Sequence, residues 1–143
     1  MNLNTEHYAR CICTLETSLQ RLAETEAGSI EYEIFRNAVV KGFELTLETA
    51  GKLLRKALKD YTGSPRDIDA LSYKDVLRRA AKHDLVTVDE TERWFAYRDN
   101  RNTTAHDYGV GFAEETLKML PGFVHDARRL ETVLREKLGN GNH

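Results

Sequence analysis

An arginine, a histidine and a tyrosine lie close together between Arg101 and Tyr108, in the stretch Arg-Asn-Thr-Thr-Ala-His-Asp-Tyr. A guanidinium presents a rigid fork of N–H donors that matches phosphate oxygens. An imidazole changes its charge near neutral pH. Arg101 and His106 could therefore bind a phosphate and move a proton beside it. The alternative is a polar helix end, with His106 hydrogen-bonded to a carbonyl and no chemistry performed.

The geometry of a helix decides which of these side chains can meet. Asn102 and His106 fall on one face, whereas Arg101 and His106 are about 140° apart in an unbroken helix. Asparagine and threonine are poor helix formers, so we expect the helix to loosen here and let Arg101 reach the imidazole. Arg98, in the same polar run, is a further candidate binding residue.

The rest of the chain offers no other familiar catalytic or metal-binding pattern. None of the five histidines pairs with a cysteine, carboxylate or second histidine at the spacing of a known metal motif. Gly109-Val110-Gly111 precedes a predicted helix but follows no strand, so it is no dinucleotide loop. The sequence predicts neither a metal nor a cofactor.

The elements that position the motif are helices. Apolar residues recur at helical spacing, and no segment alternates like a strand. We predict helices over residues 4–27, 29–61, 72–82, 89–102 and 112–138, with a turn at 62–66 and a bend or break at Pro121. Trp94, Phe95 and Tyr97 are interpreted as core rather than as a platform for nucleic-acid bases. The expected fold is all-α: an up-and-down bundle of four to five helices in one domain, residues 1–143.

Composition restricts the function classes and the compartment. The formal net charge is −2, so any contact with nucleic acid must come from a local patch, such as Arg78, Arg79 and Lys82. Such charge groups are more often simply solvated. No apolar stretch approaches the roughly 18 residues of a membrane span, and the first residues do not resemble a signal peptide. Two cysteines two positions apart suit neither a disulfide nor a shared metal. We expect a cytoplasmic protein that contacts no membrane.

The residues Arg101, His106 and Tyr108 resemble the Arg-x4-His-x-Tyr signature of the HEPN family, small helical proteins usually encoded beside a minimal nucleotidyltransferase. Residues 36–58 look like the long helix of the nucleotidyltransferase substrate-binding branch of that family, and SPRDIDAL and WFAYRDNRN follow in the expected order. The resemblance covers at least residues 36–108. One departure is visible: Gly51 precedes Lys52 where the branch usually has tryptophan, which affects local packing or the fit of a partner.

The resemblance implies a homodimer that brings two copies of the motif toward a shared cleft. Gly42 and the wide apolar stripe around it make the helix at residues 29–61 the best candidate for the dimer seam. Many family members are toxins, metal-independent ribonucleases held inactive by the neighbouring nucleotidyltransferase. In some pairs that partner transfers AMP to the tyrosine of the motif, here Tyr108. Other members are described as the substrate-binding half of a split nucleotidyltransferase.

Two functions therefore follow from the resemblance. As a ribonuclease, the chain would use His106 as general acid or base, Arg101 to stabilise phosphoryl charge, and Asn102 to orient the imidazole or donate to phosphate. As a binding subunit it would hold a nucleotide or another substrate with Arg101 and break no bond. The complete Arg-His-Tyr set favours the ribonuclease toxin, while the slightly acidic net charge favours the binding subunit. A purely structural dimer, with Arg101 and His106 idle, is a third interpretation.

Overall fold

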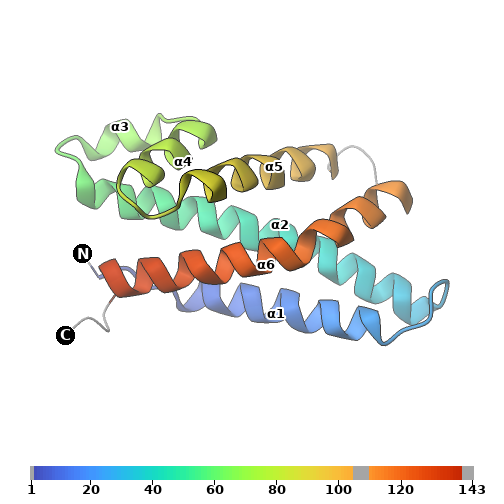
Figure 1. Cartoon of the computed structure of the whole chain (residues 1–143). Helices are drawn as coiled ribbons and strands as arrows, with labels where there is room; N and C mark the ends of the chain where they lie inside the picture. Colours follow the sequence, from blue (N-terminus) through green and yellow to red (C-terminus); the bar gives the residue numbers. More distant parts are fainter. Residues whose placement is uncertain (1, 105–109, 140–143) are drawn as a thin grey trace.

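Four long helices run alongside one another in alternating directions in a computed structural model of the chain (Figure 1). The structure describes residues 2–104 and 110–139, and the side chains of residues 2–101 and 114–139. Its described residues contain helices and no strand, which confirms the all-α prediction. None of these helices is long and apolar enough to cross a membrane. The elements are α1 (Glu6–Ala23), α2 (Ile30–Leu58), the 3-10 turn η1 (Lys59–Tyr61), α3 (Pro65–Asp69), α4 (Tyr73–Lys82), α5 (Val88–Thr104) and α6 (Val110–Leu138).

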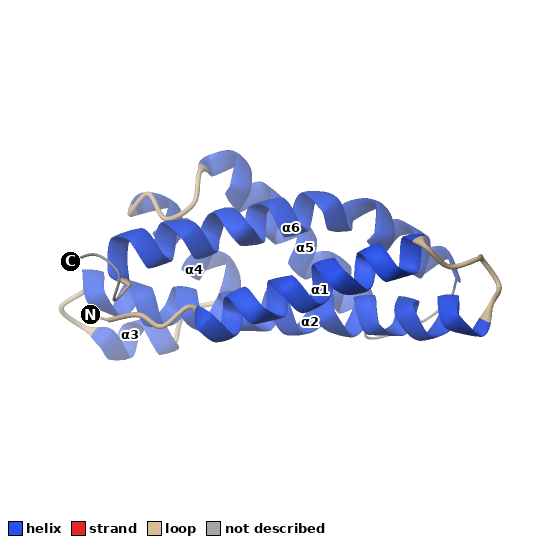
Figure 2. Cartoon of the chain, turned by 90° about the horizontal axis from the view of Figure 1, so that it is seen from below, coloured by secondary structure: helices blue, strands red, loops and turns tan. Residues whose placement is uncertain are grey.

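The long helices pack as an up-and-down bundle. α1 and α2 form a hairpin, and α6 packs against both of them (Figures 1 and 2). α5 contacts α6 and α2, and the short helices α3 and α4 cover the far end of α2 (Figure 1). The first and last described parts of the chain meet at that end of the bundle, where the Leu3 backbone N–H donates to the Leu138 carbonyl at 2.8 Å.

Four aromatic side chains form the centre of the core. Phe43 of α2, Trp94 and Tyr97 of α5 and Phe123 of α6 meet edge to face, with ring centroids 4.9 to 5.6 Å apart. Such pairs contribute about 0.5–1.5 kcal/mol each beyond the burial of their area. The predicted core position of Trp94 and Tyr97 is confirmed, whereas Phe95 is only half-buried.

Side-chain caps set the starts of α4 and α5. Ser72 accepts a hydrogen bond from the backbone N–H of Asp75 at 3.1 Å and so caps the start of α4. At the start of α5, Thr87 and Glu90 form a reciprocal capping box, with bonds of 2.8 and 3.0 Å. α5 therefore begins at Val88, one residue before the predicted start. The Thr-x-x-Glu pattern was present in the sequence and would have located this start.

The prediction of a simple turn over residues 62–66 is wrong in its second half, because α3 begins at Pro65. Proline is favoured at the first helical position, where its missing N–H is not needed. A helix of five residues is too short to be stable alone. Contacts with α2 and η1 hold it: Arg55 Nη1 donates to the Ile68 carbonyl at 2.9 Å, and Lys59 pairs with Asp69 at 2.9 Å.

Pro121 does not split the last helix, since α6 is continuous from Val110 to Leu138. The proline removes one backbone hydrogen bond. Around it, Leu120, Phe123 and Val124 are buried, so tertiary packing holds the helix together across the proline. Packing against the rest of the bundle thus outweighs the tendency of proline to break a helix.

Gly42 lies at the close approach of α1 and α2. A Cβ atom at this position would lie 3.3 Å from Leu15 Cδ1, so a larger residue would push the two helices apart. Packing within one chain thus accounts for the glycine. The dimer seam on α2 stays a prediction; Ile30, Ile34 and Leu45 of that helix are exposed in the monomer.

The turn between α4 and α5 places Asp84 in the left-handed region, at φ 60°. The N–H groups of Asp84 and Leu85 donate back to the carbonyls of Ala81 and Ala80, a Schellman motif that normally has glycine here. We expect Asp84→Gly to raise the free energy of unfolding by up to about 1 kcal/mol, measured by urea denaturation. Asp84→Ala should lower it, and a glycine variant less stable than the wild type would contradict the explanation.

Candidate functional site

The second half of α5 carries the first residues of the motif and is tied to both neighbouring helices. The guanidinium carbon of Arg98 lies 4.8 Å from the centre of the Tyr73 ring of α4, within the range of a cation–π contact. Thr116 of α6 donates to Asn100 Oδ1 at 3.1 Å. Arg98 and Arg101 are both half-buried. Contacts from α4 and α6 therefore fix the position of the helical segment that leads into the motif.

The structure places the predicted site residues as follows. α5 continues through Thr104, two residues beyond the predicted end, so Asn102 lies in a helix rather than in a loosened segment. The side chain of Asn102 and the whole of His106 and Tyr108 lie outside the described residues. The meeting of Arg101 and His106 therefore stays a prediction. Within the described part, no three histidine, cysteine or carboxylate side chains are grouped closely enough to hold a metal ion.

Gly51 leaves room for the ring that supports Arg98. A Cβ atom at Gly51 would lie 3.6 Å from Tyr73 Cε2, an ordinary contact distance. The Tyr73 ring thus packs against α2 on one side and receives Arg98 on another. Burial raises the pKa of the Tyr73 hydroxyl, partly offset by the nearby Arg98 charge. Tyr73 of α4 thus lies beside the position where the resemblance would place a tryptophan of α2.

This arrangement predicts opposite effects for two substitutions at Gly51. Gly51→Ala should raise the free energy of unfolding by up to about 1 kcal/mol, because alanine favours the helix and its methyl group fits. Gly51→Trp should lower it by about 1–3 kcal/mol, since the indole competes with Tyr73 for space. Thermal melts of Gly51→Trp with and without Tyr73→Ala provide the check. Equal losses in both backgrounds would show that Tyr73 is not the obstacle.

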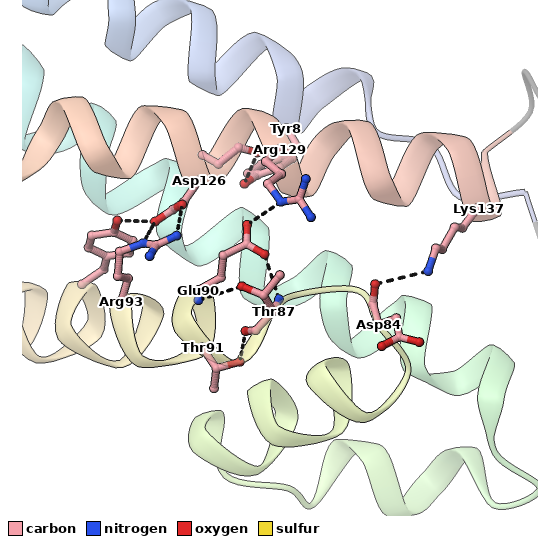
Figure 3. Close-up of polar contacts among 11 residues, drawn as sticks. Tyr8, Asp84, Thr87, Glu90, Thr91, Arg93, Asp126, Arg129 and Lys137 are labelled. Carbon is pink, nitrogen blue, oxygen red and sulfur yellow. Dashed lines mark hydrogen bonds and ion pairs between the residues drawn. The ribbon is translucent and has the colours of Figure 1, made fainter.

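A buried acid on α6 holds the first half of α5 (Figure 3). Asp126 is 1% exposed and accepts two hydrogen bonds from Arg93, at 2.8 and 2.9 Å. The hydroxyl of Tyr97 donates to the same carboxylate at 2.5 Å. Burial by itself would raise the pKa of Asp126, but the hydrogen bonds from Arg93 and Tyr97 outweigh it and hold the pKa below its usual value.

A second buried acid, Glu90, lies on α5 one turn before Arg93, and its arginine partner is on α6. Glu90 is 4% exposed and pairs with Arg129 of α6 at 3.0 Å while it completes the cap at Thr87 (Figure 3). The two ion pairs fix where α5 sits on α6 and hence where Arg98 and Arg101 project. Sequence reasoning missed both acids. For Asp126 a signal existed, because it lies three residues after Phe123 on the buried face of α6.

Comparisons with known proteins agree with this architecture. The family described as "Nucleotidyltransferase substrate binding protein like" matches residues 3–136. A Haemophilus influenzae protein named "Probable ribonuclease HepT" is 26% identical over 141 residues, covering 96% of this chain and 94% of that protein.

Two solved structures share the fold. One, from Haemophilus influenzae, is presented as the fold of a substrate binding domain of a nucleotidyltransferase; it superposes with a TM-score of 0.81 at 24% identity, over 92% of this chain and 99% of that one. Another, from Thermus thermophilus, gives a TM-score of 0.61 at 27% identity, over 85% of this chain and 98% of that one. The family model and the relative each match nearly the whole chain, which confirms the family resemblance found in the sequence. The chain belongs to the nucleotidyltransferase substrate-binding branch of the HEPN family.

Proposed function

We propose that this protein is the toxin of a toxin–antitoxin pair, a metal-independent ribonuclease that a minimal nucleotidyltransferase holds inactive. The observation that carries the proposal is similarity along almost the full chain to a relative named as a probable ribonuclease. The chain also has the complete Arg-x4-His-x-Tyr set at Arg101, His106 and Tyr108.

The chemistry needs only groups of the protein and of the RNA. The 2′-hydroxyl of a nucleotide attacks the adjacent phosphorus, and the bond to the 5′-oxygen of the next nucleotide breaks. The products are a 2′,3′-cyclic phosphate and a free 5′-hydroxyl. One histidine removes the proton of the attacking hydroxyl and another protonates the leaving oxygen, so the two His106 side chains of a homodimer supply both roles. Arg101 stabilises the negative charge that builds on the phosphoryl oxygens.

The scaffold around the motif suits this role. The half-buried Arg98 is held over Tyr73 by the cation–π contact, and Asn100 is held by Thr116, so α5 presents Arg101 on an anchored stretch of helix. Preorganised charge is the main means of stabilising a transition state of this kind, because no reorganisation is needed when the charge develops. Asn102 is assigned to orienting the imidazole of His106 or to the phosphate.

Tyr108 is proposed as the point of control. Transfer of AMP from ATP to its hydroxyl would form a phosphodiester, release pyrophosphate and place a negative charge beside Arg101. That charge would compete with the RNA phosphate for the guanidinium and block access to it. The nucleotidyltransferase partner thereby switches the site off.

The alternative is a binding subunit that presents a nucleotide or another substrate to the nucleotidyltransferase. The related fold presented as a substrate binding domain of such an enzyme supports it. Arg101 and Arg98 would then hold phosphate, and His106 would perform no proton transfer.

Expression in a bacterial host separates the two functions. For the toxin, the chain alone should arrest growth, and both His106→Ala and co-expression of the nucleotidyltransferase should relieve the arrest. Tyr108→Phe should arrest growth even with the partner present, and mass spectrometry should find the added AMP in the wild type but not in this variant. Growth that is unaffected in every combination would leave the binding subunit as the function.

A further inference from the structure

A cavity of about 650 Å³ opens where the end of α2 meets α3 and α4. Its lining residues come from the end of α2, η1, α3 and α4 and the residues that follow them, and include neither Arg98 nor Arg101. Small-molecule sites typically have volumes of about 300–1,000 Å³. The size therefore suits a ligand of nucleotide dimensions.

The lining is strongly basic on one side. Arg78, Arg79 and Lys82 are exposed along α4, and Asp75 is the one acid among the lining residues. That acid already bonds Arg78 at 2.9 Å. In the part of the chain that the structure describes, Arg79 and Lys82 form no ion pair and no side-chain hydrogen bond. Two cations are thus available to an anion, in a chain whose formal net charge is −2.

The other side of the cavity is apolar and aromatic. Leu58 and Ile68 are each 1% exposed and form its floor. The rings of Tyr61 and His83 stack with centroids 4.5 Å apart and an angle of 17° between their planes. Tyr61 remains 39% exposed, so part of its ring is open to a planar ligand. Base–aromatic stacking stabilises binding and is tolerant of base identity, because every base has a π face.

The walls of the cavity are held in place before any ligand arrives. The Arg55 side chain donates to the Ile68 carbonyl at 2.9 Å and fixes α3 on α2. The pair between Lys59 and Asp69 joins η1 to the end of α3. The cap at Ser72 sets the direction of α4 and so the placement of its cations. A preformed site loses less entropy on binding than one that must order itself.

We propose that this cavity binds a nucleoside phosphate, with Arg79 and Lys82 holding the phosphate and Tyr61 stacking on the base. The ligand is either a free nucleotide or one nucleotide of an RNA strand, since both have the same chemistry. The proposal does not depend on whether His106 cleaves RNA, because it concerns binding by a different set of residues.

The test is a titration of the full chain in a His106→Ala background, which prevents cleavage. Three probes are titrated separately: inorganic phosphate, AMP and a short single-stranded oligoribonucleotide. Binding of each probe is measured by calorimetry. The pocket variants are Arg79→Gln with Lys82→Gln, and Tyr61→Ala. Arg21→Gln with Lys41→Gln removes the same charges from exposed positions on α1 and α2 and serves as the matched control. Thermal melts confirm that each variant is folded.

The double pocket variant should bind AMP at least ten-fold more weakly than the control variant. Tyr61→Ala should weaken the binding of AMP about five-fold or more and leave the binding of phosphate unchanged, since only AMP has a base to stack. If a strand is the natural ligand, the oligoribonucleotide should bind well in excess of AMP, and the double variant should reduce its salt-dependence slope by about 1.4. Equal binding of all three probes by the pocket and control variants would overturn the proposal. An AMP affinity that is insensitive to Tyr61→Ala would overturn its assignment to a nucleotide.

Discussion

Replacing His106 with alanine is expected to slow RNA cleavage by about two to four orders of magnitude, the usual contribution of a general acid or base. In a homodimer the substitution removes both histidines at once, so the upper part of that range is expected. The measurement is the single-turnover rate on a labelled oligoribonucleotide, with the products analysed for a 2′,3′-cyclic phosphate and a 5′-hydroxyl. A chelator such as EDTA should leave the wild-type rate unchanged, because the proposed steps use only histidine, arginine and the 2′-hydroxyl.

The matched control for this prediction is His125→Ala. His125 is an exposed histidine on α6, so it tests the loss of an imidazole from the surface of the same chain. It should cleave at the wild-type rate. If His106→Ala also cleaves at that rate, the proposed acid–base chemistry is wrong, whatever the effect of the chain on growth.

Removing the Asp126 carboxylate is expected to be the most destabilising of the substitutions considered. Asp126→Ala should lower the free energy of unfolding by about 2–4 kcal/mol. The loss leaves the buried hydroxyl of Tyr97 without its acceptor and frees Arg93. Arg93 is half-exposed and can turn to water, which is why the figure is below the full cost of an unpaired buried charge. Urea denaturation at neutral pH measures the difference.

Two further variants make the Asp126 prediction specific. Glu136→Ala removes an exposed acid from the same helix and should change stability by less than about 0.5 kcal/mol. Asp126→Asn keeps the size and one acceptor oxygen but loses the charge, so an intermediate loss is expected. A loss no larger than that of Glu136→Ala would show that the carboxylate does not hold α5 on α6.

The pH dependence of the Asp126 effect has a definite sign. The pKa of Asp126 is lower in the folded protein than in the unfolded chain, so folding stabilises the ionised carboxylate. This stability is fully present above the unfolded value of about 3.9 and is lost as the pH falls through the lower folded value. The stability difference between wild type and Asp126→Asn should therefore shrink below about pH 4. A difference that stays constant or grows as the pH falls would contradict the assignment.

The sequence by itself was sufficient for the fold class, for the family and for most helix positions. Apolar residues at helical spacing commit a segment to a helix with one buried face, and that signal is local. The motif between Arg101 and Tyr108 was recognised from residue types at fixed spacing, which requires no tertiary contact.

Tertiary structure decided what local signals could not. Contacts with α2 and η1 stabilise the five-residue α3 at a position where the local sequence indicates a turn, and burial of its neighbours keeps α6 continuous through Pro121. Only the packing shows that Tyr73 occupies the space beside Gly51 and supports Arg98. The anchoring of Asp126 by Arg93 and Tyr97 joins residues about thirty positions apart, a pairing that no sequence period encodes. The residue types that give the motif its chemistry thus lie in a short stretch of sequence, whereas the orientation of α5, which carries Arg101, depends on contacts between residues far apart in the chain.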